Sequence, residues 1–188
     1  VIRVNEPLAL PGSKIYLTGN GYAPVIVVRD QDGKVSFSGP VVFLPQDSNL
    51  TSLGAIKVPD AQSPVGFVAS FLPTFSRTST QGGISIYPEL LDPKLLFSIW
   101  EGDLGLDSGM PQSVYRIDTS KMKRIALNSL KPGETYNFSA GSITFETFVP
   151  WINLQIVDDP GKKYALYGAI AAILGLLASL FGRRRRIW

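Results

Sequence analysis

The stretch YALYGAIAAILGLLASLFG, residues 164–182, divides the fold into two parts, because it runs for 19 residues without a charged side chain. At about 1.5 Å per residue, an α-helix of this length spans roughly 28 Å, close to the hydrocarbon thickness of a bilayer. The helix of a soluble protein is rarely this long and apolar on every face. We therefore expect a β-rich domain at 1–157, a juxtamembrane turn at 158–163, a transmembrane helix at 164–182 and a basic tail at 183–188.

The charges that flank this helix predict its direction in the membrane. Four arginines follow it directly: Arg183, Arg184, Arg185 and Arg186. Positive residues beside a membrane helix favour the cytoplasmic side, and these four outnumber Lys162 and Lys163 on the other flank. We therefore expect a single-pass segment in the plasma membrane, with the C-terminus in the cytoplasm and residues 1–157 on the extracytoplasmic side.

Small residues recur along the predicted helix at spacings of three or four: Gly168, Ala172, Gly175, Ser179 and Gly182. Residues at this spacing share one helix face, and small side chains let a second helix approach closely. The alternative is that glycine and alanine are simply frequent in membrane helices. We favour a face that packs on a partner helix, because the small residues run the whole length.

Charge and composition exclude several function classes. The chain has 18 basic and 15 acidic residues, so without the four arginines the balance is 14 to 15, a net charge of −1. A nucleic-acid surface needs clustered basic residues on the folded body. The chain has no Cys and no His, which excludes disulfides, thiolate chemistry, His-dependent triads and histidine ligands to zinc or haem.

The body is predicted to be mainly β, as an antiparallel β-sandwich or irregular barrel, because 18 Gly and 14 Pro argue against long helices. Residues 25–28 and 34–37 form a hairpin pattern around an Asp-Gly turn. Ile143 and Phe145 alternate with Thr144 and Glu146, as in a half-buried strand. Further strands are expected at 65–71, 95–100 and 113–117, and an exposed loop at 73–83.

The sequence Asp158-Asp159-Pro160-Gly161 lies directly before the apolar helix. Proline is unfavourable inside a helix but suits a turn just before one. We therefore expect a short turn to tether the domain, with the lower edge of the domain close to the lipid surface.

A serine hydrolase is the enzymatic alternative, because Ser120 and Lys123 match the S-x-x-K pattern. That pattern needs a helix to bring the lysine to the serine, together with companion motifs S-D-N and K-T-G. Neither companion occurs, and the flanking sequence is typical of strand and turn. The hydrolase interpretation is therefore disfavoured.

The candidates for metal and docking sites are acidic, thioether and aromatic residues. The acidic stretch 101–109 misses the spacing of a calcium loop, and a turn anchored by Leu104 and Leu106 explains it better. We assign no metal site and no catalytic residue. Met110 and Met122 are the only thioethers that could ligate iron, and no pattern marks either. Three aromatics are candidates for docking a partner, although core positions are the commoner role: Trp100, Tyr115 and Trp151.

Several stretches, taken in order, resemble the ResB family of cytochrome c biogenesis proteins. They are GNGYAPVIVVRDQDG, FLPTF, GGISIYPELLDPKL and IWEGDLGLDSGMPQSVYRID, followed by the ending INLQIVDDPGKKYALYGAIAAILGLLASLFGRRRRIW. Each short motif is weak alone, but the ordered set covers nearly the whole chain. The resemblance identifies the chain as the extracytoplasmic domain and final membrane helix of such a protein.

The resemblance implies a role in system II cytochrome c maturation, in which the protein works with CcsA to bring haem across the membrane and attach it to apocytochrome c. It implies earlier membrane helices that carry the haem-ligating histidines, so no catalytic or haem-binding residue is transferred to this chain. The expected partners are CcsA, apocytochrome c and the lipid bilayer, and haem is handled by the complex. A structural subunit of a membrane complex without a haem role is the alternative.

Overall fold

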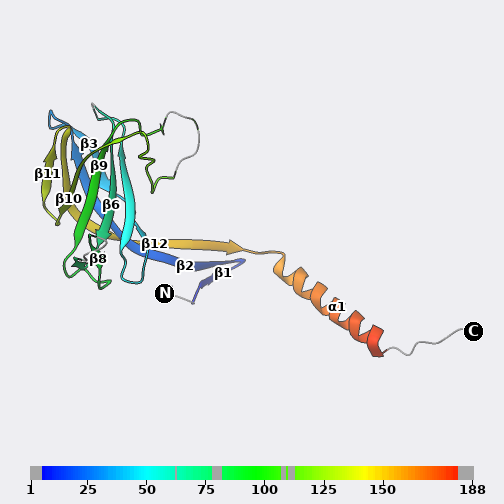
Figure 1. Cartoon of the computed structure of the whole chain (residues 1–188). Coiled ribbons are helices and arrows are strands. Elements are labelled where there is room, and N and C mark those ends of the chain that lie inside the picture. The colour runs from blue at the N-terminus through cyan, green and yellow to red at the C-terminus, as the bar shows by residue number, and fades with distance from the viewer. Residues whose placement is uncertain (1–5, 62, 78–81, 107–108, 110–112, 182–188) are drawn as a thin grey trace, which may run out of the picture. The chain divides into compact units, whose positions relative to one another are not determined.

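The computed structural model describes residues 6–61, 63–77, 82–106, 109 and 113–181 (Figure 1). By its internal contacts the chain divides into two compact units. One is Asn20–Ile152, which we call the body, and the other combines Val1–Gly19 with Asn153–Trp188. Two long strands, β2 (Ser13–Arg29) and β12 (Gly141–Asp158), contribute residues to both units.

Two antiparallel sheets form the body, as expected for a mainly β fold. In the first sheet, β2 pairs with β3 (Val35–Pro40), and β12 lies between β2 and β11 (Thr135–Phe138). The second sheet has the order β10-β9-β6-β5-β4, and β7 pairs with β8 in a small third sheet. The bounds of these strands are β4 Leu44–Pro45, β5 Ser52–Val58, β6 Val65–Leu72, β7 Phe75–Ser76, β8 Ile84–Ser85, β9 Lys94–Glu101 and β10 Lys123–Leu130.

The inward side chains of the two sheets share one hydrophobic core. Ile143 and Phe145 of β12 are fully buried, which confirms the alternation seen in the sequence. Phe71 of β6 meets Phe145 edge to face, with ring centroids 6.1 Å apart. Edge-to-face contacts of this kind add to the gain from burying apolar area. The core therefore joins the sheets into a sandwich.

The predicted hairpin is confirmed between β2 and β3, where Val28 pairs with Phe37. The Asp30 carboxylate accepts hydrogen bonds from the backbone N–H groups of Asp32 at 3.0 Å and Lys34 at 2.9 Å. Gly33 has φ of 78°, a conformation that suits glycine. The strands predicted at 65–71 and 95–100 are likewise confirmed as β6 and β9.

Two sequence predictions about the body are wrong. Residues 113–117 are not a strand: Val114 and Tyr115 form a turn, in which the Tyr115 N–H donates to Ser113 Oγ at 3.2 Å. Ile117 does not pair in a strand; its side chain packs over Gly66 of β6. The loop predicted at 73–83 is not exposed at its start, because Pro73 and Thr74 are buried and β7 follows them.

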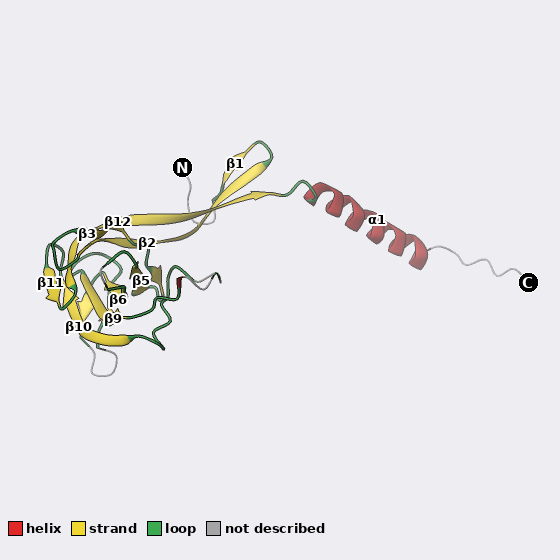
Figure 2. Ribbon diagram, turned by 90° about the horizontal axis from the view of Figure 1, so that it is seen from above, coloured by secondary structure: helices red, strands yellow, loops and turns green. Residues whose placement is uncertain are grey.

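The second unit consists of a narrow ribbon and a helix. β1 (Leu8–Leu10) pairs antiparallel with the start of β2, and Thr18 Oγ1 donates to the Asn153 carbonyl of β12 at 3.2 Å. Figure 2 shows β1, the start of β2 and the end of β12 running side by side. After β12, a turn through Pro160 and Gly161 leads into α1 (Lys162–Phe181).

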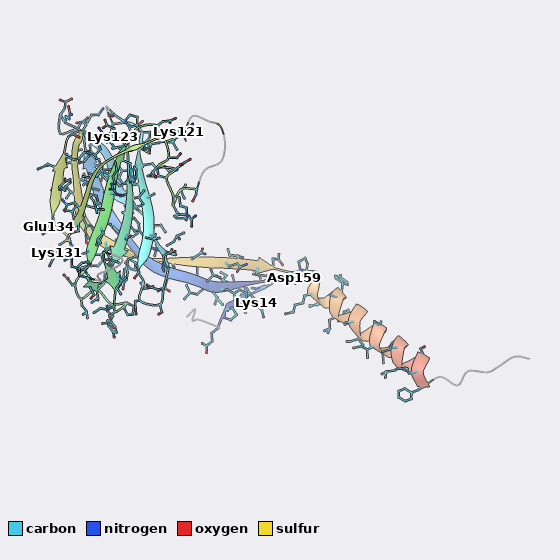
Figure 3. All side chains as sticks on the ribbon, viewed as in Figure 1. Lys14, Lys121, Lys123, Lys131, Glu134 and Asp159 are labelled. Atoms are coloured by element: carbon cyan, nitrogen blue, oxygen red, sulfur yellow. The ribbon has the colours of Figure 1, made fainter. Side chains whose placement is uncertain are left out.

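Helix α1 begins two residues before the predicted position 164. Asp159, marked in Figure 3, accepts a backbone hydrogen bond from Lys162 at 3.4 Å, and Ala165 donates to Gly161 at 3.0 Å. The proline before the helix therefore lies in a turn, as expected. By length and composition, α1 is able to cross a membrane, and it is the one such helix among the described residues.

Candidate functional site

The small-residue face of α1 contains four of its five predicted members within the described chain: Gly168, Ala172, Gly175 and Ser179. At about 100° per residue these four lie within an arc of roughly 60°. A Cβ added at Gly168 or Gly175 would meet nothing within 4 Å, and no residue of α1 is buried. The fifth member, Gly182, and the arginines at 183–186 lie outside the described residues.

The second candidate surface is the outer face of the β10-β9-β6-β5-β4 sheet, opposite the core. In its ladder, Val68 of β6 lies opposite Ala55 of β5 and Ser98 of β9, and Ser98 lies opposite Leu127 of β10. Leu127 is 73% exposed, the largest value among the large apolar residues described in the body. Around Leu127 this face is thus open and partly apolar, whereas Leu104 and Ile117 cover it at Gly66. An open apolar area is unusual for the solvent side of a sheet.

Two hollows lie on this outer face and meet at Val68. The larger, of about 700 Å³, extends over Leu96 and Leu127 and is bordered by Lys94 and Arg77. The smaller, of about 300 Å³, lies between Leu53 and the segment that carries Tyr115. Openings of this size accommodate part of a polypeptide or a small molecule.

The three candidate docking aromatics lie in different surroundings. Trp100 is on the outer face, where its Nε1–H donates to Ser98 Oγ at 2.8 Å. Tyr115 is 38% exposed and lines the smaller hollow. Trp151 belongs to β12 in the other sheet, with its indole over Gly21, and its buried Nε1 has no hydrogen-bond partner in the described structure. No ring contact recorded among the described residues joins any two of them.

Ser120 and Lys123 do not form the helical arrangement that a serine hydrolase needs. Ser120 lies in an exposed turn, and Lys123 is the first residue of β10. The Ser120 backbone N–H donates to Asp118 Oδ1 at 3.0 Å, and this bond lowers the pKa of the Asp118 carboxyl. The serine therefore belongs to a turn that its own backbone stabilises.

In the described part of the acidic stretch, residues 101–106 and Gly109, only one of the two predicted anchors is buried, and Asp107 and Ser108 lie outside the described residues. Leu104 is 5% exposed, whereas Leu106 is 44% exposed, so the second anchor was wrongly predicted. Asp103 accepts a hydrogen bond from the Gly105 N–H at 2.7 Å, and Glu101 accepts one from Ser63 Oγ at 2.6 Å. Among the described residues no three acidic side chains gather where they could hold a metal ion.

The thioethers offer no exposed ligand within the described part of the chain. Met122 is 9% exposed and packs beside Gly102. Met110 lies outside the described residues.

Sequence reasoning did not predict the open outer face or the role of β10 at its edge. Which side chains lie together on the outer face depends on the register between β5, β6, β9 and β10, and several of these strands are far apart in sequence. A usable signal was Leu127 directly before the polar pair Asn128-Ser129.

Comparison with known proteins gives one match and two negative results. The family model described as the ResB-like family matches residues 1–188. No curated protein and no solved structure shows significant similarity. Because the family match covers the whole chain, and a membrane-compatible helix follows a β body as the resemblance requires, the assignment rests on both sequence and fold. The chain belongs to the ResB-like family, and its role lies in cytochrome c biogenesis.

Proposed function

We propose that this chain is a membrane-anchored accessory platform of system II cytochrome c maturation. It assists a CcsA-type membrane protein in delivering haem and attaching it to apocytochrome c. The observation that carries the proposal is the family match over residues 1–188. The body stands on the extracytoplasmic side, where the attachment takes place, and the C-terminus lies in the cytoplasm.

The residue types of the chain support an accessory role over a haem-ligating one. The chain contains no His and no Cys, the side chains that most often bind haem iron. Met122, the one described thioether, is buried in the body. The absence of His and Cys and the burial of Met122 favour haem held elsewhere in the complex, with this segment supporting the proteins that handle it.

The small-residue face of α1 supports packing against a partner helix. Helices in lipid associate by close van der Waals contact, which small side chains permit. Gly168, Ala172, Gly175 and Ser179 present such a face, and α1 contacts no described element that would bury it. In this proposal the partner is a helix of the CcsA-type protein.

Co-purification tests this packing. Gly175→Leu combined with Ser179→Leu fills the small-residue face and leaves the helix apolar. We expect the doubly substituted chain to reach the membrane, to lose the CcsA-type protein on affinity purification and to lower covalent haem in cytochromes c.

The matched control is Ile170→Phe combined with Leu177→Phe, which enlarges side chains on the opposite face of α1. This variant should keep the partner. Retained partner and full maturation in the Gly175/Ser179 variant would contradict the helix part of the proposal. Loss of the partner with normal covalent haem would instead support a structural subunit without a haem role.

A further inference from the structure

Strand β10 forms one end of the second sheet and is paired along one edge only. Its recorded partner is β9, from Leu130 opposite Leu95 to Lys123 opposite Glu101. Within the described chain no strand pairs with its other edge. Lys123 and Lys131, marked in Figure 3, bound the strand at its two ends. An eight-residue strand with one open edge is long enough to pair with another extended segment.

The backbone groups at this open edge belong to Leu127 and Ser129. The Ser129 N–H donates a hydrogen bond to Asn128 Oδ1 at 2.7 Å, so this N–H does not point to β9. Alternate residues of an antiparallel strand direct their N–H and C=O groups to the same edge, so those of Leu127 also face the open side. The Asn128 side chain thus occupies the hydrogen-bonding position at Ser129 that a carbonyl of an added strand would take.

The side chains of these same two residues line the larger hollow. Leu127 and Ser129 lie on the outer face beside Ser98 and Leu96, and the hollow of about 700 Å³ extends from them to Val68. A segment paired with the edge would therefore place every second side chain beside an apolar hollow. The open backbone edge of β10 and the larger hollow thus lie next to each other.

The charge of the outer face is one-sided. The outward residues of β5, β6, β9 and β10 include Lys57, Lys94 and Arg124 and no carboxylate. Lys94 is held at the hollow, with its Nζ 3.9 Å from the centroid of the Phe75 ring, and Arg77 also borders it. Without the four terminal arginines the chain has a net charge of −1, so this concentration of cations is local. Carboxylates on a partner would complement it.

We infer that β10 is a docking edge for an extended polypeptide segment that carries an apolar and an acidic side chain two residues apart, so that both lie on one face of the added strand. The segment adds as a strand along Leu127 and Ser129. Its apolar side chain packs on Leu127 at the near end of the hollow, and its carboxylate lies on the face that carries Lys94 and Arg77. This docking does not depend on the haem role proposed above, because it needs only the backbone edge, the hollow and the cations.

Peptide binding to the full chain in lipid nanodiscs tests the inference. The probe is a fluorescent octapeptide, Glu-Thr-Leu-Thr-Glu-Thr-Leu-Thr, read by anisotropy, in which Glu and Leu share one face of the strand. One control is the same peptide with two N-methylated amides, which cannot pair with a strand edge, and another has Lys in place of each Glu. We expect the Glu-Leu peptide to bind about tenfold more tightly than the N-methylated control, since two lost backbone hydrogen bonds are worth roughly that factor. It should also bind more tightly than the Lys control, whose charges are repelled by Lys94 and Arg77.

Two variants locate the site. Leu127→Pro removes an N–H from the open edge without removing a bond to β9, and Leu127→Asp places a carboxylate beside the hollow. Each should weaken peptide binding by about tenfold or more. The matched control is Val35→Asp, at a residue that is 43% exposed and belongs to β3 in the other sheet. It should bind as the unchanged chain does, and unchanged thermal unfolding verifies that the variants are folded.

Three outcomes would overturn the inference. The first is no binding of the Glu-Leu peptide, or binding that N-methylation or Leu127→Pro leaves unchanged. The second is a dimer in the nanodisc-free, detergent-solubilised chain that Leu127→Pro dissociates, since the edge would then hold a second copy. The third is binding of the body to phosphatidylglycerol vesicles that Leu127→Asp abolishes, since the face would then contact lipid.

Discussion

The body and the ribbon-helix unit have opposite relations to solvent. Every buried apolar residue of the described chain lies within Asn20–Ile152. In the other unit no described apolar side chain is buried: Ile15 and Leu17 of β2 are half-buried, Ile156 of β12 is 70% exposed and Leu174 of α1 is 60% exposed. The body therefore contains its own hydrophobic core, whereas α1 requires an apolar environment from outside the chain.

This difference separates two kinds of substitution effect. Changes in the body should act on its free energy of unfolding, while changes in α1 should act on membrane insertion and, under the proposed function, on helix packing. The following variants test whether the two regions respond independently.

The largest effect is expected from Phe71→Ala. Phe71 is fully buried and contacts Tyr22 and Phe145 edge to face. Its truncation should lower the free energy of unfolding by about 3–5 kcal/mol, since large-to-small changes leave a cavity. Chemical unfolding of the chain in detergent, followed by tryptophan fluorescence, measures this. Leu174→Ala in α1 is the control, and a comparable loss there would break the comparison.

Ile173→Arg should act on the membrane and spare the body. Ile173 lies near the middle of α1 and is 59% exposed. An arginine at the centre of a membrane helix costs about 3 kcal/mol of insertion free energy. We expect a smaller carbonate-resistant membrane fraction with unchanged unfolding of the body, and Ile173→Leu should behave as the unchanged chain. A full membrane fraction for Ile173→Arg would argue that α1 is not a membrane anchor.

Gly141→Ala should destabilise the body by about 2–3 kcal/mol, since it combines overpacking with backbone strain. Gly141 has φ of 144°, and an added Cβ would overlap the Arg29 carbonyl oxygen. The matched control is Gly133→Ala, where φ is 86° but an added Cβ meets nothing within 4 Å. That control should cost about 1 kcal/mol, the strain alone. Equal losses in the thermal unfolding of the two variants would show that the close approach to Arg29 has no consequence.

The smallest changes in the free energy of unfolding are expected for two tryptophans of the body, and the two should differ. Trp100→Phe loses the hydrogen bond from Nε1 to Ser98 Oγ and should cost about 1 kcal/mol. Trp151→Phe removes a buried Nε1 that has no partner in the described structure, so its cost should be smaller, below about 0.5 kcal/mol. Denaturant midpoints of the two variants check this order. A larger loss for Trp151→Phe would indicate that its Nε1 is bonded in the protein.

Local patterns predicted much of this fold. The Asp-Gly hairpin, the alternation around Ile143 and the uncharged stretch of α1 each depend on neighbours in sequence, and each is confirmed. The failures involve contacts between distant residues. Ile117 alternates with polar residues as in a strand but packs over Gly66. Thr74 is polar and was predicted to lie in an exposed loop, but it is buried, and its Oγ1 donates a hydrogen bond to the Glu89 carbonyl at 2.6 Å.

The candidate sites divide in the same way. The small-residue face of α1 is a helical pattern and can be found from sequence alone. The open edge of β10 and the cations on its face arise from pairing among strands that are distant in sequence, so spacing could not indicate them. Trp100 and Tyr115 were chosen by residue type, which predicted neither the hydrogen bond of Trp100 to Ser98 nor the turn that holds Tyr115.

Covalent haem in a strain that lacks this chain tests the central claim most directly. Membrane and periplasmic proteins are separated under denaturing conditions and stained for haem, with the unchanged chain restored on a plasmid as the control. A role in cytochrome c maturation predicts that the haem-stained c-type bands disappear in the deletion strain and return on complementation. Bands of normal intensity in the deletion strain would contradict the account.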